Sequence, residues 1–364
     1  MTATTPDLPT DVLDDLGQRA GRRRYLFWSL GLVAGLVVTV VLAVAMGAVQ
    51  INPGTVLRIV SHHLLGVPEV ATWPRSQDSI VWQVRLPRVL LGVAVGAALA
   101  VCGVALQAMV RNLLADPYLL GVTSGASTGA AAAILFGFGA ALGENALSGS
   151  AFIGALAASI AVFVVARTGG RVTSLRLLIS GVAVGYALYA ATSFLIFAAN
   201  SAEGSRSVLF WLLGSLSLAR WSTALAIALV LVGATIALLT LWSTRLDALA
   251  IGDETAQTLG VSPTRFRIQL LVVVSLCVGA VVAASGGIGF VGLVIPHLAR
   301  RMIGAIHRRV VPVAALVGAI FLVWADVAAR VLLQPRELPI GIITAIVGAP
   351  FLVLLVRRFH ATTE

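Results

Sequence analysis

The sequence predicts an all-α polytopic membrane protein with about ten transmembrane helices. Its 364 residues are 59% hydrophobic and only 11% charged, whereas the apolar share of soluble domains is typically about 45 to 50%. Apolar runs recur along the chain, and about 20 such residues in a helix span the ~30 Å core of a bilayer. Because no polar segment exceeds a loop in size, we expect one membrane domain at 25–358 between tails at 1–24 and 359–364.

Ten apolar runs carry this expectation. The first follows Arg22, Arg23 and Arg24 and also resembles a cleaved signal sequence, but it is longer than the 7 to 15 residues of a signal core. The eighth contains Pro296, which neighbouring helices make tolerable in a membrane. The runs are 25–46, 89–107, 118–136, 151–166, 177–199, 222–242, 268–284, 288–299, 311–329 and 338–356.

Four glycine pairs at GxxxG spacing predict close helix packing within this bundle. Small residues at this spacing let helix backbones approach each other in lipid. The pairs are Gly31/Gly35, Gly92/Gly96, Gly125/Gly129 and Gly181/Gly185.

The basic residues predict the orientation. All 25 are Arg, and with an even number of spans 17 fall on the side of the two termini and 8 on the other. The positive-inside rule therefore places both termini in the cytoplasm of a cell-membrane protein. The Arg residues are scattered at the ends of apolar runs, which argues against a nucleic-acid partner. The absence of Lys excludes a Walker A loop, so the chain cannot hydrolyse ATP through its own P-loop.

The segment 246–261, LDALAIGDETAQTLGV, predicts a short helix on the cytoplasmic membrane surface. Asp253 and Glu254 suit a first helical turn, and Gly260 is placed to end the helix in the left-handed conformation. A solvated loop helix is the alternative. A membrane protein with one such projection and no chemistry of its own is expected to be moved by a partner that grips it.

Few residues suggest chemistry in the membrane. Asp326 is the one charge within a predicted span, and Arg330 four residues later favours a structural ion pair over a proton relay. No catalytic set, cofactor motif or metal cluster is evident, so the chain is not expected to be an enzyme. Cys102 and Cys277 lie within apolar runs and are interpreted as small core residues.

The fifth run offers a candidate lining for a transport pathway. Tyr186, Tyr189 and Ser193 share one helical face, with Thr192 beside it. Aromatic and hydroxyl groups would let an amphipathic solute slide without tight binding. Simple packing of the two Tyr between helices is the alternative.

Several motifs, in order, resemble the FecCD family of ABC importer permeases, which carry iron-siderophores, haem and vitamin B12. They cover about 25 to 358. One departure is Leu113, where the family has Pro. The motifs are RLPR at 85–88, RNLLADPYLLGVTSGASTGA at 111–130, WLLGSL at 211–216, GDETAQTLGV at 252–261, GGIGFVGLVIPHLARR at 286–301 and ELPIGIITAIVGAPF at 337–351.

The resemblance also implies the subunit assembly and the partners. It implies a homodimer or heterodimer of ten-helix subunits, with a transport path lined by the fifth and tenth helices. Two separate ATPase subunits would each bind a coupling helix at about 252–260, and an extracytoplasmic binding protein would deliver the cargo. The implied cargo is a ferric siderophore, with haem or cobalamin as the alternative. An ion-coupled carrier is a third possibility, which the lack of mid-membrane acids disfavours. The residues implied are Gly252, Asp253, Glu254, Thr255, Ala256, Leu259 and Gly260 for coupling, and Arg85, Arg88 and Arg330 for docking of the binding protein.

Overall fold

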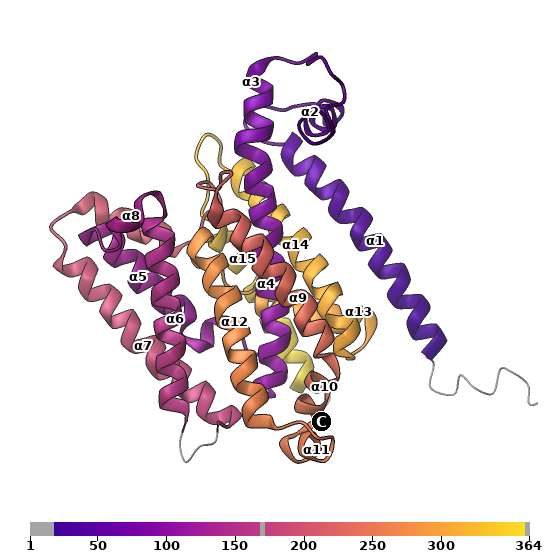
Figure 1. Cartoon of the computed structure of the whole chain (residues 1–364), viewed down its shortest axis with the longest axis vertical. Helices are drawn as coiled ribbons and strands as arrows, with labels where there is room; N and C mark the ends of the chain where they lie inside the picture. Colours follow the sequence, from indigo (N-terminus) through magenta and orange to yellow (C-terminus); the bar gives the residue numbers. More distant parts are fainter. Residues whose placement is uncertain (1–17, 168–171, 361–364) are drawn as a thin grey trace, which may run out of the picture.

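The computed structural model of the chain describes residues 18–167 and 172–360, and the described residues form helices and loops without a strand. This confirms the predicted all-α class. Parts of the two predicted tails, 1–17 and 361–364, lie outside the described residues. Figure 1 shows a bundle with most helices running in roughly the same direction, and with short helices at its two ends.

The long helix α4 (Leu86–Val110) is the centre of the bundle. Its apolar residues surround it on every side, which is the pattern of a helix buried all round, and nearly all of its side chains are buried. Figure 1 shows other helices on several sides of α4. It packs against α9 (Thr223–Leu241), α12 (Pro263–Ser285), α13 (Val291–Ile303) and α14 (His307–Val331).

A second group of helices lies beside this central group, on the left in Figure 1. α5 and α6 pack closely against each other, α7 packs on both, and α12 contacts α5 and α6. The group therefore joins the central bundle mainly through α12, and α7 and η3 also contact α4. Its helices are η3 (Pro117–Leu120), α5 (Val122–Phe136), η4 (Ala140–Asn145), α6 (Ala146–Ala166), α7 (Ser174–Ala198) and α8 (Ala202–Leu212).

Short helices mark two opposite ends, which we call the α2 end and the α11 end (Figure 1). The longer helix α1 (Gln18–Ala45) lies at the edge of the bundle in Figure 1, and α15 (Ile340–His360) packs against α13 and α14. The α2 end carries α2 (Pro53–Leu65), α3 (Arg75–Asp78) and the π-helix η2 (Ser79–Arg85). The α11 end carries α10 (Ser243–Ile251) and α11 (Asp253–Thr258).

All ten predicted runs are helical, but they are not equally long. Seven helices of the described residues are long and apolar enough to cross a membrane, and the helices at 122–136 and 340–354 are shorter apolar segments. The eighth run is shorter than the membrane span that was predicted. It forms α13, whose 13 residues rise only about 20 Å, after a non-helical stretch at 286–290.

Three predicted boundaries also move. α1 begins at Gln18, within the predicted tail, and α15 continues to His360. The second span extends from Arg75 to Val110, well before the predicted start at 89. The predicted run began after the arginines at 85 and 88, whereas the helix continues through them, and both guanidinium groups have buried partners.

Candidate functional site

The predicted coupling segment is two helices rather than one. α10 ends at Ile251 and α11 begins at Asp253, with Gly252 in extended backbone between them (φ 162°, ψ 163°). This corrects the single helix expected over 246–261. Glycine lacks the side-chain contacts that favour continued helix, and here the chain changes direction at it.

The end of α11 confirms the predicted glycine cap. Gly260 has φ 78°, its N–H donates to Gln257 O at 2.9 Å, and the N–H of Val261 donates to Ala256 O at 2.8 Å. This pair of bonds is the Schellman motif, which satisfies carbonyls that the helix end would otherwise leave unpaired.

The coupling segment projects apolar side chains from the α11 end. Ala256 is fully buried against the bundle, whereas Ile251 is 70% exposed and Leu259 is 64% exposed. Glu254, in the first turn of α11, is also exposed. Two large apolar side chains beside a carboxylate form a small projection of the kind that a protein groove can receive.

The carboxylate of Asp253 is held by two arginines. Its two oxygens lie 2.7 and 2.8 Å from the guanidinium of Arg267, and Arg111 lies 3.8 Å away. The hydrogen bonds from Arg267 are the main reason that the pKa of Asp253 is below its usual value. A lowered pKa means that the stability from this pair is present above the usual pKa of ~3.9 and is lost only as pH falls through the lowered value.

A second acidic residue fixes α10 to α14. Asp247 Oδ1 lies 2.6 Å from His307 Nδ1 and accepts the backbone N–H of His307 at 3.1 Å. His307 is the first residue of α14, so the carboxylate sits where a helix has unpaired N–H groups and positive dipole charge. The sequence gives no signal for this contact, because its two residues are far apart in the chain.

At the α2 end, Arg85 binds the end of α1. Its guanidinium donates to the carbonyl oxygens of Val44 at 2.8 Å, Ala45 at 3.0 Å and Val49 at 2.5 Å. The last carbonyls of a helix have no partner within the helix and carry the negative end of its dipole. Arg85, which is buried, therefore caps α1 from a neighbouring helix.

Asp326 lies between two buried arginines. It receives hydrogen bonds from Arg88 at 2.9 to 3.2 Å and forms an ion pair with Arg330 at 3.1 Å. Arg88 also pairs with Glu337 at 2.9 Å, and Arg330 donates to the carbonyl of Met46 at 3.1 Å. The predicted ion pair between Asp326 and Arg330 is thus part of a larger network.

All three arginines predicted to dock a binding protein are buried in this network. Arg85, Arg88 and Arg330 are 7, 8 and 7% exposed, so none offers a free guanidinium to the outer surface. Their contacts show a structural task, which is to join α1, η2, α4 and α14. Docking of a binding protein by these residues stays a prediction. An effect of these arginines on docking would act through the positions of the four helices that they join.

The predicted pathway residues on α7 divide between two faces. Tyr186 and Tyr189 are 72 and 68% exposed, and Ser193 is exposed on the same side. Thr192 is 4% exposed and lies 2.9 Å from Thr128 of α5 through their hydroxyl oxygens. Thr192 therefore does not share the exposed face of the two tyrosines: at 100° per residue, it points toward α5 while Ser193 points outward. The pathway role of these residues stays a prediction.

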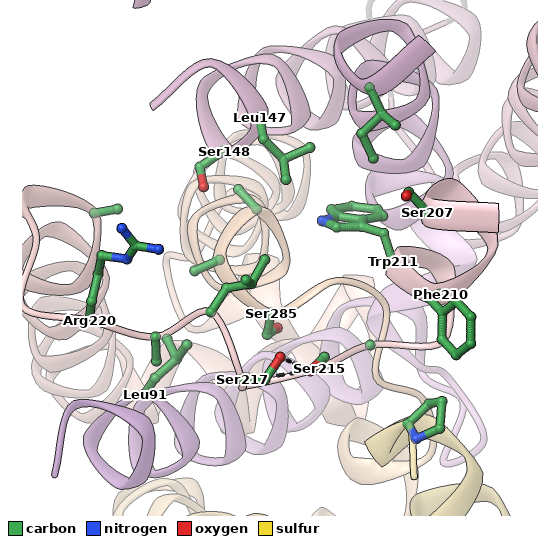
Figure 2. Close-up of a pocket in the computed structure, with 18 of the residues that line it drawn as sticks. Leu91, Leu147, Ser148, Ser207, Phe210, Trp211, Ser215, Ser217, Arg220 and Ser285 are labelled. Carbon is green, nitrogen blue, oxygen red and sulfur yellow. Dashed lines mark hydrogen bonds between the residues drawn. The ribbon is translucent and has the colours of Figure 1, made fainter. Parts of the chain in front are cut away.

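A cavity of about 1270 Å³ opens at the α2 end between the two groups of helices. Figure 2 shows Trp211 and Ser207 of α8 on one side and Arg220 on another, with Ser215, Ser217 and Ser285 close together. Ser215 and Ser217 share a hydrogen bond of 2.9 Å. This cavity was not predicted from the sequence, although the serines that follow Gly214 in a non-helical segment were a signal.

Three non-helical segments meet beside the cavity. The N–H of Ser215 donates to Ser285 O at 2.8 Å, and the N–H of Ile340 donates to Gly214 O at 3.2 Å. Non-helical backbone at membrane depth is tolerated where it is buried in protein or lines water. The lining of the cavity combines serines with larger apolar side chains such as Leu91, Phe210 and Trp211.

The described residues contain no group of three or more His, Cys, Asp or Glu that could hold a metal ion. Cys102 and Cys277 are free and buried, in agreement with their interpretation as core residues. The described part of the chain thus contains buried ion pairs between helices, the exposed segment predicted for coupling, and a face of aromatic and hydroxyl groups on α7.

Comparisons with known proteins identify the family of the chain. Residues 35–358 match the FecCD transport family. The chain is 43% identical to the cobalamin import system permease protein BtuC of Halobacterium salinarum over 80% of this chain and 75% of that protein. It is 41% identical to the hemin transport system permease protein HmuU of Yersinia pestis, over 79% of this chain and 86% of that protein.

The fold is also similar to a solved structure, an inward-facing conformation of a putative metal-chelate type ABC transporter. The TM-score is 0.78 at 33% sequence identity, over 91% of this chain and 98% of that one. The similarity therefore extends over almost the whole helical bundle described above.

Proposed function

Since the chain belongs to the FecCD transport family and is the permease of an ABC importer, we propose that it carries a metal chelate across the cell membrane. The proposed cargo is a ferric siderophore, and haem and cobalamin are the alternatives. The relatives named above are a cobalamin and a hemin permease, so the shared chemistry is a metal ion enclosed by an organic ligand. A fully chelated metal needs no metal ligands from the pathway.

The proposed pathway lies between two permease subunits. α7 is apolar, yet only 11% of its most apolar 18-residue stretch is buried in the single chain. Its exposed face carries Tyr186 and Tyr189. On α15, Ile346 and Leu354 are 64 and 61% exposed. A second copy or a related permease would cover such faces, and the aromatic and hydroxyl groups would line the space between the subunits.

The observation that carries the proposal is the coupling segment at the α11 end. It is anchored through Asp247, Asp253 and Ala256, and it presents Ile251 and Leu259 outward. We propose that each of two ATPase subunits receives one such segment in a groove. ATP is then bound and hydrolysed by the partner, which fits a chain that has no Lys for a P-loop.

The distribution of arginines supports an orientation for this assembly. The side with more Arg includes the α11 end and both termini, and we propose that it faces the cytoplasm. The α2 end would then face outward and receive an extracytoplasmic binding protein. In this arrangement Arg85, Arg88 and Arg330 keep the outer corner in the shape that the binding protein meets.

Replacing Leu259 with Asp is expected to lower the affinity for the ATPase about 30-fold, because an apolar anchor of an interface typically contributes ~2 kcal/mol. The side chain is exposed, so the fold of the permease should persist. Copurification of the tagged permease with its ATPase measures the effect. Leu65→Asp is the matched control, because Leu65 is 77% exposed at the opposite end. Equal copurification of both variants would contradict this role.

The function itself is tested by ATP hydrolysis in vesicles that contain the permease and its ATPase. The binding protein is added loaded in turn with ferric siderophore, haem or cobalamin. We expect stimulation by the ferric siderophore form. Stimulation only by the haem-loaded or cobalamin-loaded binding protein would change the assigned cargo and leave the proposed ATP-driven mechanism in place. Uptake that follows an ion gradient without an ATPase would refute the proposal.

A further inference from the structure

We propose that Arg267 is the positioning residue that links movement of the coupling segment to the start of α7, the proposed pathway helix. This inference rests on the proposed function of the coupling segment. Arg267 lies near the start of α12, outside the predicted pathway and outside the predicted coupling residues. It is the largest fully buried side chain of the described residues, with 1% exposure.

Every N–H of the Arg267 guanidinium has a partner. Both terminal nitrogens bind the carboxylate of Asp253, at 2.7 and 2.8 Å. Nη2 also donates to Ser174 Oγ at 2.9 Å, Nη1 donates to Val172 O at 3.3 Å, and Nε donates to Met109 O at 3.3 Å. An arginine side chain has five N–H donors in a rigid planar arrangement, and these five bonds use all of them.

These partners come from three different parts of the fold. Asp253 is the first residue of α11, Met109 lies in the last turn of α4, and Ser174 is the first residue of α7. Ser174 Oγ additionally donates to Met109 O at 3.1 Å. One rigid side chain on α12 therefore holds the coupling segment, the central helix and the pathway helix together.

The strength of these contacts favours joint movement of α11 and Arg267 over breakage of the ion pair between Asp253 and Arg267. A buried guanidinium that loses its carboxylate partner is strongly destabilised, and hydrogen bonds between charged groups are stronger than those between neutral groups. When α11 moves with its ATPase, Asp253 therefore takes Arg267 with it, or α12 follows. Either movement changes the bonds to Val172 and Ser174, and so reaches the end of α7.

Arg111 does not provide an equivalent link. It lies 3.8 Å from Asp253 and its side chain is 43% exposed, so it contributes a weak, solvent-screened attraction. The bonds that cross from the coupling segment to α7 in the described residues near Asp253 pass through Arg267.

The test uses vesicles with the complete importer, including its ATPase and loaded binding protein. Three variants cut the link at different points: Asp253→Asn at the α11 side, Ser174→Ala at the α7 side, and Arg267→Gln at the centre. Arg265→Gln is the matched control, because Arg265 is an exposed arginine two residues away on the same helix. The measured quantities are ATPase copurification, ATP hydrolysis and the number of cargo molecules moved per ATP.

We expect Ser174→Ala to retain the assembled complex and ATP hydrolysis. Asp253 belongs to the coupling segment itself, so Asp253→Asn is compared per assembled complex and per ATP hydrolysed. Cargo moved per ATP should fall about 5-fold or more, the lower range of typical coupling free energies. The double variant should be no worse than the worse single variant, because both substitutions cut one path. Arg265→Gln should resemble the wild type.

The outcomes distinguish failure of the proposed transport function from failure of the proposed role of Arg267. A wild-type complex without ATP-dependent transport would refute the proposed function itself. A coupled wild type whose ratio is unchanged in both Asp253→Asn and Ser174→Ala would overturn the role of Arg267, and so would strictly additive losses in the double variant. Should Arg267→Gln not assemble, these two milder variants decide the question.

Discussion

Replacing Asp326 with Ala is expected to prevent stable folding of the α2 end, whereas replacing Glu337 with Ala is expected to change stability little. Both carboxylates lie 2.9 Å from the guanidinium of Arg88. The side chain of Asp326 is 2% exposed and that of Glu337 is 46% exposed. Burial, and not the ion-pair distance, therefore makes the difference.

Loss of the Asp326 carboxylate leaves two buried positive charges, Arg88 and Arg330, without their common partner. Removal of one member of a buried ion pair typically costs about 3 to 5 kcal/mol, while an exposed pair contributes about 0 to 1 kcal/mol. Thermal unfolding of the detergent-purified variants, followed by size-exclusion chromatography, measures the difference. Similar unfolding temperatures for the two variants would contradict the assignment of Asp326 as the centre of the network.

Asp326→Asn separates the structural role from a proton relay. A relay needs a carboxylate that exchanges protons, so its amide variant would assemble normally and lose transport. In the observed network the carboxylate balances two guanidinium groups, so we expect stability and transport to decline together in this variant. Normal stability with complete loss of transport would favour the relay.

The sequence predicts the part of this network that lies within one helix. Asp326 and Arg330 are four residues apart, and this spacing places both on one helical face. Arg88 is more than two hundred residues away, and the carbonyl partners of Arg85 carry no residue-type signal at all. Backbone acceptors are the same in every residue, so a sequence pattern cannot reveal which helix end an arginine will cap.

The coupling segment shows a similar division. Its acidic first turn and its glycine cap are local features, and both are found where the sequence predicts them. The break at Gly252 depends on how α10 and α11 pack on the bundle, and helix propensity alone does not fix it. Arg267 was hidden because the predicted span began at 268. Pro263 after Ser262 is a helix-start signal, and it would have placed Arg267 inside the helix.

The shared helical face was predicted correctly for the periodic residues of α7, while the neighbouring residue lies on another face; a role of these residues in a pathway stays a prediction. Tyr186, Tyr189 and Ser193 follow the helical repeat and are all exposed on α7. Thr192 is adjacent in sequence to Ser193, but adjacent residues on a helix differ by about 100°. Its hydroxyl instead bonds to Thr128 of α5, which a single-sequence pattern does not reveal.

Replacing Gly96 with Ala is expected to destabilise the permease by about 1 to 3 kcal/mol, the usual cost of overfilling a packed core. A methyl group at this position would overlap the carbonyl oxygen of Gly318, and a methyl group at Gly318 would overlap that of Gly96. Both obstacles are backbone atoms, so no side chain can rotate away, and α4 and α14 must move apart.

Gly31→Ala is the matched control, since Gly31 also belongs to a predicted GxxxG pair and lies within a helix. No atom lies within 4 Å of a Cβ at Gly31, and alanine is a better helix former than glycine by about 0.5 to 1 kcal/mol. We therefore expect an unchanged or raised unfolding temperature for this variant and a lowered one for Gly96→Ala. The same motif thus predicts close packing only where a second helix is present to use it, as α14 is at Gly96. Equal unfolding temperatures for the two variants would mean that α4 and α14 can separate at little cost, against the contact seen between their backbones.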